Sequence, residues 1–270
     1  MKQQLHKQHF KSLLLAVLAF VPFTVSAQTY PIAIDATNFP DANFRAYLLE
    51  QDYGKDSVIT ENEIKDIRSI KVSVKNINRL KGVEYFTELE ELTCMGNLLT
   101  SLDISKNTAL TSLSCGINLL TFLDISNNIA LTHLECSINK LTSLDVSNNI
   151  ELESISCYRN MIAGEAMDAF INSLPENTTG ERYTLCISSD DKQEGNVCTT
   201  DHVAKATAKG WSVENSLGEK YEGVATGIAL QTIENIDTNA PIYDLSGKRV
   251  NNLQGKKGIY IIGGKKVLKK

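Results

Sequence analysis

The middle of the chain repeats itself with a period of 21 residues. The unit reads LxxLxCxxNxLTxLDxSxNxx and starts at Leu89, Leu110 and Leu131, with partial copies from Ile67 and Leu152. Its two most regular columns are the cysteines Cys94, Cys115, Cys136 and Cys157 and the asparagines Asn97, Asn118, Asn139 and Asn160. So many positions held in register predict stacked, nearly identical units, because one unit cannot bury its apolar side alone.

Each unit is expected to contribute one short strand to a parallel sheet and then to turn back through the core. Alternation along a strand places Leu92 and Cys94 inside and Thr93 outside. Stacked coils lie about 4.8 Å apart, so five of them give a strip roughly 20–25 Å wide. The predicted fold class is an α/β repeat solenoid, a right-handed coil of about five repeats over residues 67–162.

The repeated polar and thiol columns have structural explanations. Each cysteine replaces the second inward leucine of its coil, and thiols on adjacent strands point the same way, which is poor geometry for a disulfide. We therefore expect free, packed thiols that act as small apolar side chains. The asparagines lie where the chain leaves the strand, where an amide satisfies backbone groups of the turn. Asp103, Asp124 and Asp145 predict Asx turns, with a cation-binding ladder as the weaker alternative.

Residues 28–66 are expected to form a helical N-terminal cap. Asp41 precedes a segment with apolar residues at helical spacing. A second helix is predicted to begin at Thr60, because Thr60 and Glu63 have the spacing of a capping box. Two short helices would cover the first coil.

The segment between these two helices is similar to a damaged EF-hand loop. Asp52, Asp56 and Glu63 fall at its first, fifth and twelfth positions. The third position is Gly54, which has no side-chain oxygen, and the sixth is Ser57 where glycine is needed for the turn. We interpret the loop as a degenerate calcium loop kept as a cap, with weak Ca²⁺ binding as the alternative and no other cofactor.

Residues 163–224 are predicted to form a strand–helix–strand cap at the other end of the solenoid, where the last coil needs cover. The expected elements are a helix over 164–174 stopped by Pro175, a strand over 183–187, a helix over 201–209 with Thr200 as N-cap, and a strand from Trp211. Cys186 and Cys198 lie outside the repeat and are a possible disulfide, at even odds with free thiols. Residues 225–240 are the predicted linker, and 241–270 form a small, basic, β-rich module.

The first 27 residues predict a secretory signal peptide. They hold three lysines, no acid, the apolar run Leu13 to Val21, and a small-residue end at Ala27. The run is too short to span a bilayer, so the mature chain is expected to have no transmembrane span. Cleavage would leave 24 of the 27 basic residues against 32 acidic ones, a net charge of about −8. Such a charge repels phosphate backbones and argues against a nucleic-acid partner.

Several segments resemble one known family. The repeat LTSLDISKNTALTSLSCGIN resembles the 21-residue leucine-rich repeats of secreted proteins of the Bacteroidetes type, as does the preface NFPDANFRAYLLEQDYGKDSVITENEI. The block AMDAFINSLP to NVCTTDHVAKATAKGWSV is similar to the usual C-terminal cap of these proteins. The ending IYDLSGKRV to KGIYIIGGKKVLKK is similar to sorting or anchor-like segments of type IX secretion. The resemblance implies export, with secretion or display on the outer surface of a Gram-negative bacterium, and implies no reaction.

The outward strand positions are the candidate binding surface, because solenoids present an extended concave sheet whose exposed residues vary freely. These positions are Glu91, Thr93, Met95, Ser112, Ser114, Gly116, Ile117, His133, Glu135, Ser137, Ile138, Ser154, Ser156, Tyr158 and Arg159. Tyrosine and arginine are frequent at the energetic centres of interfaces. We therefore predict a non-catalytic adhesion or binding module for a protein or surface glycan.

Two alternatives remain. The solenoid is a structural spacer of the cell envelope, or an enzyme uses the exposed face that carries His133 and Glu135. The second is the weaker, because the sequence has no nucleophile elbow, no metal-spaced histidines and no phosphate-binding glycine loop. Only His133 and His202 would remain after cleavage of the first 27 residues.

Overall fold

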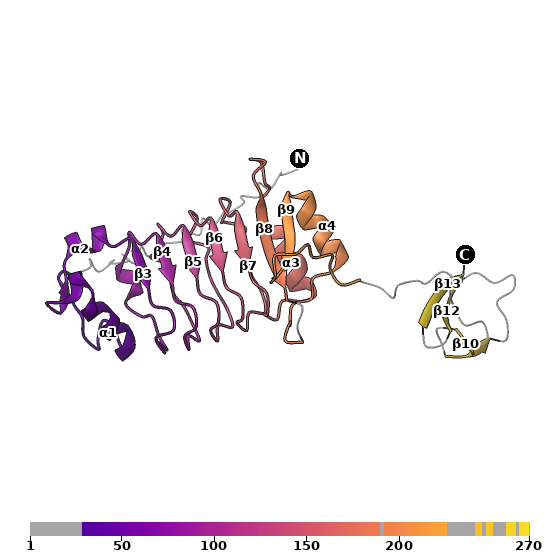
Figure 1. Cartoon of the computed structure of the whole chain (residues 1–270), viewed down its shortest axis with the longest axis horizontal. Helices are drawn as coiled ribbons and strands as arrows, with labels where there is room; N and C mark the ends of the chain where they lie inside the picture. The colour runs from indigo at the N-terminus through magenta and orange to yellow at the C-terminus, as the bar shows by residue number, and fades with distance from the viewer. Residues whose placement is uncertain are drawn as a thin grey trace, which may run out of the picture.

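A parallel sheet of seven strands in chain order, β3 to β9, runs through the protein (Figure 1). The computed structural model describes residues 29–189, 192–225, 241–244, 247–250, 258–262 and 265–269, so the predicted signal peptide and residues 226–240 of the predicted linker lie outside the described residues. The strands are β3 (Ser69–Lys71), β4 (Glu91–Thr93), β5 (Ser112–Ser114), β6 (His133–Glu135), β7 (Ser154–Ser156), β8 (Tyr183–Ser188) and β9 (Trp211–Asn215).

The register of the sheet follows the 21-residue period. Leu92 pairs with Leu113, Leu113 with Leu134, and Leu134 with Ile155, so equivalent residues of successive coils lie side by side. These central residues are almost fully buried. The predicted solenoid of about five repeats is confirmed, with β3 to β7 as the strands of the five coils.

The cysteine column lies in the core beside the leucines. All four of its thiols are free and have no exposed surface. Burial raises the pKa of the Cys94 thiol to about 12 and the pKa values of the other three well above the ordinary value of 9.0. The four thiols thus lie in the core in the positions of small apolar side chains.

The asparagine column connects neighbouring coils. The Asn118 side chain accepts a hydrogen bond from the Leu99 N–H at 3.0 Å and donates to the Cys94 and Cys115 carbonyls, both at 3.0 Å. Cys94 belongs to the preceding coil, so one amide serves both coils. The predicted role is therefore confirmed, and it extends beyond the residue's own turn.

Two further columns of the repeat are also structural. Asn107, Asn128 and Asn149 are fully buried and donate to carbonyls of the preceding coil. The aspartates form the predicted Asx turns, as in Asp124, whose Oδ1 accepts the Ser126 N–H at 2.9 Å. Hydrogen bonds from Ser126 lower the pKa of the Asp124 carboxyl.

The N-terminal cap lies at one end of the sheet (Figure 1). It comprises β1 (Ile32–Ala33), α1 (Ala42–Glu50), the 3₁₀ turn η1 (Asp52–Gly54), β2 (Val58–Ile59) and α2 (Glu61–Asp66), and a second 3₁₀ turn, η2 (Val83–Tyr85), follows in the first coil. Asp41 caps α1, and Thr60 with Glu63 forms the predicted capping box of α2. Asp41 also accepts the Asn78 and Arg79 N–H groups, which joins the cap to the first coil.

The C-terminal cap contains α3 (Glu165–Ser173) and α4 (Thr200–Ala208) around β8 and β9. The N-cap of α4 is Thr199, so the predicted cap at Thr200 is wrong by one residue. The Thr199 Oγ1 accepts the His202 N–H, and His202 Nδ1 accepts the Thr199 N–H. A histidine thus takes the place that glutamate or glutamine holds in the usual capping box, which hides the motif in the sequence.

The loop between β8 and α4 ends the stack of coils. Both carboxylate oxygens of Glu194 accept the Arg159 N–H at 3.0 Å, where earlier coils use a carbonyl of the next coil. Asn196 accepts the Ile162 N–H and donates to the Cys157 carbonyl, which is the bonding pattern of the asparagine column. The two side chains replace the coil that is missing at this end.

The tail forms the expected β-rich module. Its antiparallel sheet has the order β11-β10-β12-β13, with β10 (Ile242–Tyr243), β11 (Arg249–Val250), β12 (Gly258–Ile262) and β13 (Lys265–Lys269). Tyr260 and Ile262 form a small hydrophobic cluster separate from the main core. The short strand β11 was not expected from the sequence.

Candidate functional site

The outward face of the sheet, here called the strand face, consists of two rows of side chains that cross the strands. The first row is Ser69, Glu91, Ser112, His133, Ser154, Thr184 and Ser212. The second row is Lys71, Thr93, Ser114, Glu135, Ser156, Cys186 and Glu214. Small hydroxyl side chains therefore dominate the face.

Charged side chains lie toward the two ends of the strand face. Near the N-terminal end, Lys71 Nζ is 3.0 Å from Glu91 Oε2, and this contact lowers the pKa of the Glu91 carboxyl. At the other end, Arg182 forms an ion pair with Glu214. The middle strands β5 and β7 carry only half-buried serines at the outward positions. The middle of the strand face is therefore lined by short hydroxyl side chains and lies between the two ion pairs. These four serines, Ser112, Ser114, Ser154 and Ser156, are here called the hydroxyl floor.

Glu135 is the exception in the middle of the floor. Its Oε2 accepts the Gly116 N–H and its Oε1 accepts the Ser137 N–H, both at 3.0 Å, so the carboxylate joins two coils. Burial raises the pKa of Glu135, although these hydrogen bonds oppose the rise. A Cβ atom at Gly116 would lie 2.2 Å from Glu135 Oε2, which explains the glycine. This predicted binding residue holds the backbone together.

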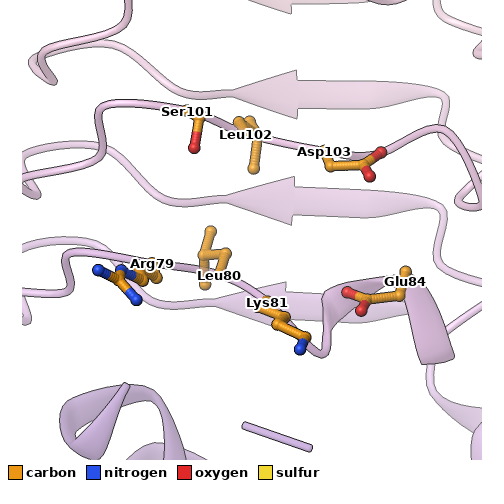
Figure 2. Close-up of a pocket in the computed structure, with 7 residues that line it drawn as sticks. All are labelled: Arg79, Leu80, Lys81, Glu84, Ser101, Leu102 and Asp103. Atoms are coloured by element: carbon orange, nitrogen blue, oxygen red, sulfur yellow. The ribbon is translucent and has the colours of Figure 1, made fainter. Parts of the chain in front are cut away.

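His133 and Glu135 share the face but are engaged with different groups. His133 is exposed, and its Nδ1 lies 2.7 Å from Thr132 Oγ1. Three cavities of 260–300 Å³ are lined by other residues. Figure 2 shows one of them, on the return segments of the first two coils, with Arg79, Ser101, Glu84 and Asp103 among its lining residues.

The remaining predicted binding residues lie in the loops after the strands. Met95 and Tyr158 are half-buried, and Ile117, Ile138 and Arg159 have positive φ angles of 53°, 55° and 52°. Gly116 and Ser137, expected to be exposed, are buried, so that prediction is wrong. The backbone bends toward the asparagine column here, which breaks the inside–outside alternation of the strand.

The three carboxylates of the calcium-like loop are not brought together. Asp52 has a 96% exposed side chain and pairs with Lys55, while Glu63 Oε2 accepts the Thr60 N–H at 2.7 Å. Asp56 Oδ1 accepts the Val58 N–H. Within the described ranges, no group of three or more histidine, cysteine, aspartate or glutamate side chains is placed to hold a metal ion.

The possible disulfide between Cys186 and Cys198 is absent, and both thiols are free. Cys186 alternates with buried Leu185 and Ile187 and so lies on the strand face, where its Sγ donates to the Asn215 carbonyl. Cys198 is buried in the core. The two thiols lie on opposite sides of the sheet, a relation that sequence spacing does not reveal.

Searches find no matching protein-family model and no similar curated protein. Among solved structures, the functional domain of InlJ from Listeria monocytogenes, described as including a cysteine ladder, has a TM-score of 0.50 and 28% identity. The alignment covers 64% of this chain and 40% of that one. The internalin InlF of the same organism has a TM-score of 0.47 and 20% identity over 68% of this chain and 57% of its own.

The chain thus spans less than two thirds of the InlJ domain and of InlF. The one-strand-per-coil parallel sheet, together with the likeness to InlJ, identifies the fold as a leucine-rich-repeat solenoid. In this chain the four cysteines of the repeat are buried in successive coils. No helix in the part of the chain that the structure describes has the length and apolarity needed to cross a membrane.

Proposed function

We propose that the protein is a non-catalytic binding module whose strand face holds a polypeptide of another protein. The observation that carries the proposal is the hydroxyl floor of the middle strands. Ser112, Ser114, Ser154 and Ser156 have short side chains, which leave room for a partner to approach the sheet. Their hydroxyl groups both donate and accept hydrogen bonds, so the floor suits polar backbone and side-chain groups.

The borders of the floor supply the specific contacts. The ion pairs Lys71–Glu91 and Arg182–Glu214 mark the two ends of the face. His133 is exposed in the centre, and Tyr158 with Arg159 lies at the edge. Buried aromatic and arginine anchors dominate many interfaces, so these two residues are the candidates for the largest contributions to affinity.

Affinity capture of partner proteins with variants that place a large side chain on the hydroxyl floor tests this proposal. Ser114→Arg places a long charged side chain on the strand face and should remove specific partners from the captured proteins, as judged by quantitative mass spectrometry. Ser147→Arg, at an exposed position in a return segment, is the matched control. Partners captured equally by both variants and by the unmodified chain would exclude the strand face as the binding site.

We further propose that the protein is exported and acts at the outer surface of its cell. The proposal rests on the sequence alone, through the basic and apolar N-terminus and the resemblance of the tail to sorting segments. Fractionation combined with N-terminal sequencing tests it. A mature protein in the cell-surface or medium fraction should begin after Ala27, whereas an uncleaved cytoplasmic protein would refute the proposal.

A further inference from the structure

The loops that follow strands β3 to β7 contain no acidic residue, although the chain has a net charge of −5. These loops, here called the turn surface, are residues 73–79, 95–101, 116–122, 137–143 and 158–164. They carry four basic residues, Lys75, Arg79, Lys140 and Arg159.

Acidic residues lie at the opposite ends of the same strands. Glu88 and Glu90 precede β4, and Glu151 and Glu153 precede β7. Figure 2 shows this polarity on the first two coils, where Arg79 extends toward the turn surface while Glu84 and Asp103 lie toward the other end. The turn surface is therefore cationic, whereas the opposite ends of the strands carry mainly acidic side chains, two of which, Glu88 and Glu90, are paired with Arg68.

Three carboxylates of residues outside these loops accept hydrogen bonds from the backbone of the turn surface. Asp41, Glu135 and Glu194 each accept backbone N–H groups of these loops. All three are buried or half-buried. They therefore lie beneath the side chains that project outward.

Apolar side chains project from the same loops. Val74 is 79% exposed, Ile117 48% and Leu98 46%. Leu119 and Met161 are also exposed. Phe122 is 65% exposed as well, so exposed apolar side chains, here called the apolar tips, occur in the loops of the first, second, third and fifth coils.

Three residues of the turn surface have a backbone conformation that is rare for their residue type. Val74, Ile117 and Ile138 have φ angles of 55°, 53° and 55°. A β-branched residue is disfavoured there, whereas glycine, which the second coil has at Gly96, is not. Ile117, Ile138 and Arg159 each directly precede an asparagine of the column, so the turn imposes this conformation, and the side chains of Val74 and Ile117 face water.

We propose that the turn surface docks the protein on an anionic lipid bilayer. Apolar tips flanked by basic residues insert shallowly at the headgroup boundary, and anionic lipids attract the cations. The coils lie about 4.8 Å apart, so the tips form a ridge of roughly 20 Å that one flat surface contacts at once.

The geometry favours a bilayer over the other occupants. A second copy that used the same edge would bring like charges together. An acidic protein is disfavoured, because the two cavities that reach the turn surface, at Arg79 and at Phe122, are also lined by carboxylates. These carboxylates are Glu84 and Asp103 in the first cavity and Asp124 and Asp145 in the second. Docking by this edge leaves the strand face open to a partner, so the two proposals are independent.

A fluorophore placed at single sites tests the docking directly. The apolar run near the N-terminus and the lysine-rich end provide other routes to lipid, so binding of the whole chain is not sufficient evidence. An environment-sensitive dye on Leu119→Cys reports from the turn surface. The same dye on Ile150→Cys, which is 67% exposed just before β7, is the matched control.

The dye at Leu119→Cys should shift to the blue on addition of phosphatidylcholine vesicles that contain phosphatidylglycerol, and not with phosphatidylcholine alone. The dye at Ile150→Cys should shift with neither. Equal shifts at both sites, or none at Leu119→Cys, would overturn the proposal. A shift induced by protein concentration alone would indicate a second copy. A shift with polyglutamate but not with vesicles would indicate an acidic protein, and either result also overturns it.

Charge reversal gives a second readout on the full chain. Lys140→Glu should weaken partition into the anionic vesicles roughly fivefold for each unit of charge changed. Lys106→Glu reverses an exposed lysine outside the turn surface and should have a clearly smaller effect. Equal losses for the two variants, or loss only when lysines of the tail are reversed, would refute docking by this edge.

Discussion

Asn118 shows why polar side chains lie in this core. Its amide makes four hydrogen bonds, one from the Leu99 N–H and three to the Cys94, Cys115 and Gly116 carbonyls. The coil turns sharply after β5, so these backbone groups cannot all pair with the sheet. Buried backbone groups left without partners are costly. The asparagine column satisfies them from inside the turn.

Asn118→Ala should therefore lower the free energy of unfolding by about 1–3 kcal/mol, because it leaves the buried Leu99 N–H without its partner and removes hydrogen bonds to the Cys94 and Cys115 carbonyls. Denaturant unfolding measures the change. Ser114→Ala, on the half-buried strand face, is the control and should be nearly silent. Equal losses for both variants would contradict the structural role of the asparagine.

Glu135 should make stability depend on pH. Burial raises its pKa above the ordinary value of 4.5, so the folded state binds this proton more tightly than the unfolded state. The protonated carboxyl adds to the free energy of unfolding. This stabilisation is fully present below the pKa of the unfolded state and is lost as pH rises through the pKa of the folded state.

Glu135→Gln removes this titration. The melting temperature of the variant relative to the unmodified chain should rise as pH increases from the ordinary pKa of 4.5 through the raised pKa of the folded state. Glutamine cannot accept both backbone N–H groups, so a constant offset is expected and only the slope with pH is diagnostic. A flat or opposite slope would contradict the raised pKa.

At the scale of elements, the two ends of the sheet use different devices. Asp41 joins α1 to the first coil, while Glu194 and Asn196 imitate a coil beyond the last. A solenoid without such caps would expose apolar surface and unpaired backbone. In the C-terminal loop, the side chains of Glu194 and Asn196 pair with backbone N–H groups that a further coil would otherwise satisfy.

Asn196→Ala should destabilise the protein about as much as Asn118→Ala, by about 1–3 kcal/mol, because it leaves the Ile162 N–H without its partner. Hydrogen exchange adds a local readout, since the Ile162 amide should exchange faster. Ser216→Ala, at an exposed position after β9, serves as the control. Unchanged protection of Ile162 would exclude the capping role.

The N-terminal loop should not respond to calcium. Asp52, Asp56 and Glu63 have separate partners, and Glu63 is needed in the capping box of α2. The melting temperature should be the same in calcium and in chelator, because only a ligand that binds the folded state shifts it. An increase with calcium that Asp52→Asn abolishes would show that the loop rearranges to bind the ion.

At the scale of the whole molecule, one hydrophobic core extends from Ile32 in β1 to Val213 in β9. The four stacked thiols lie along this core. Coils contact only their neighbours, yet the caps and the asparagine column connect each coil to the next. We expect the solenoid to unfold as one unit.

Thiol alkylation tests this cooperativity. Burial and raised pKa values should keep the cysteine column unreactive in the native state, because the thiolate is the reactive form. With increasing denaturant, Cys94 and Cys157 should become modified at the same midpoint in peptide mass spectrometry. Separate midpoints would show that the two ends unfold independently.

Much of this architecture was predictable because it depends on periodicity. The position of each strand, the burial of Leu92 and Cys94, and the asparagine turns follow from a period of 21 combined with alternation along a strand. The caps of α1 and α2 follow from local hydrogen bonding at Asp41 and Thr60. Such features involve residues close in sequence or one repeat apart.

The candidate site was predictable only in part. The rows of the strand face follow from the register, but the burial of Ser137 and the clamp by Glu135 depend on how far the backbone bends after each strand. The separation of Cys186 from Cys198 depends on which side of the sheet each thiol occupies. The spacing of residue types along the sequence does not specify how far the backbone bends or on which side of the sheet a thiol lies.

The repeat in the sequence is enough to specify the coil, its length and the residues that face its core, because identical units can bury their apolar sides only by stacking. The tertiary structure alone decided how the ends are closed, where the loop carboxylates point, and which charges share an edge. Those outcomes depend on contacts between residues 20 to 40 positions apart, such as Glu194 with Arg159, whose geometry exists only after the coils have stacked.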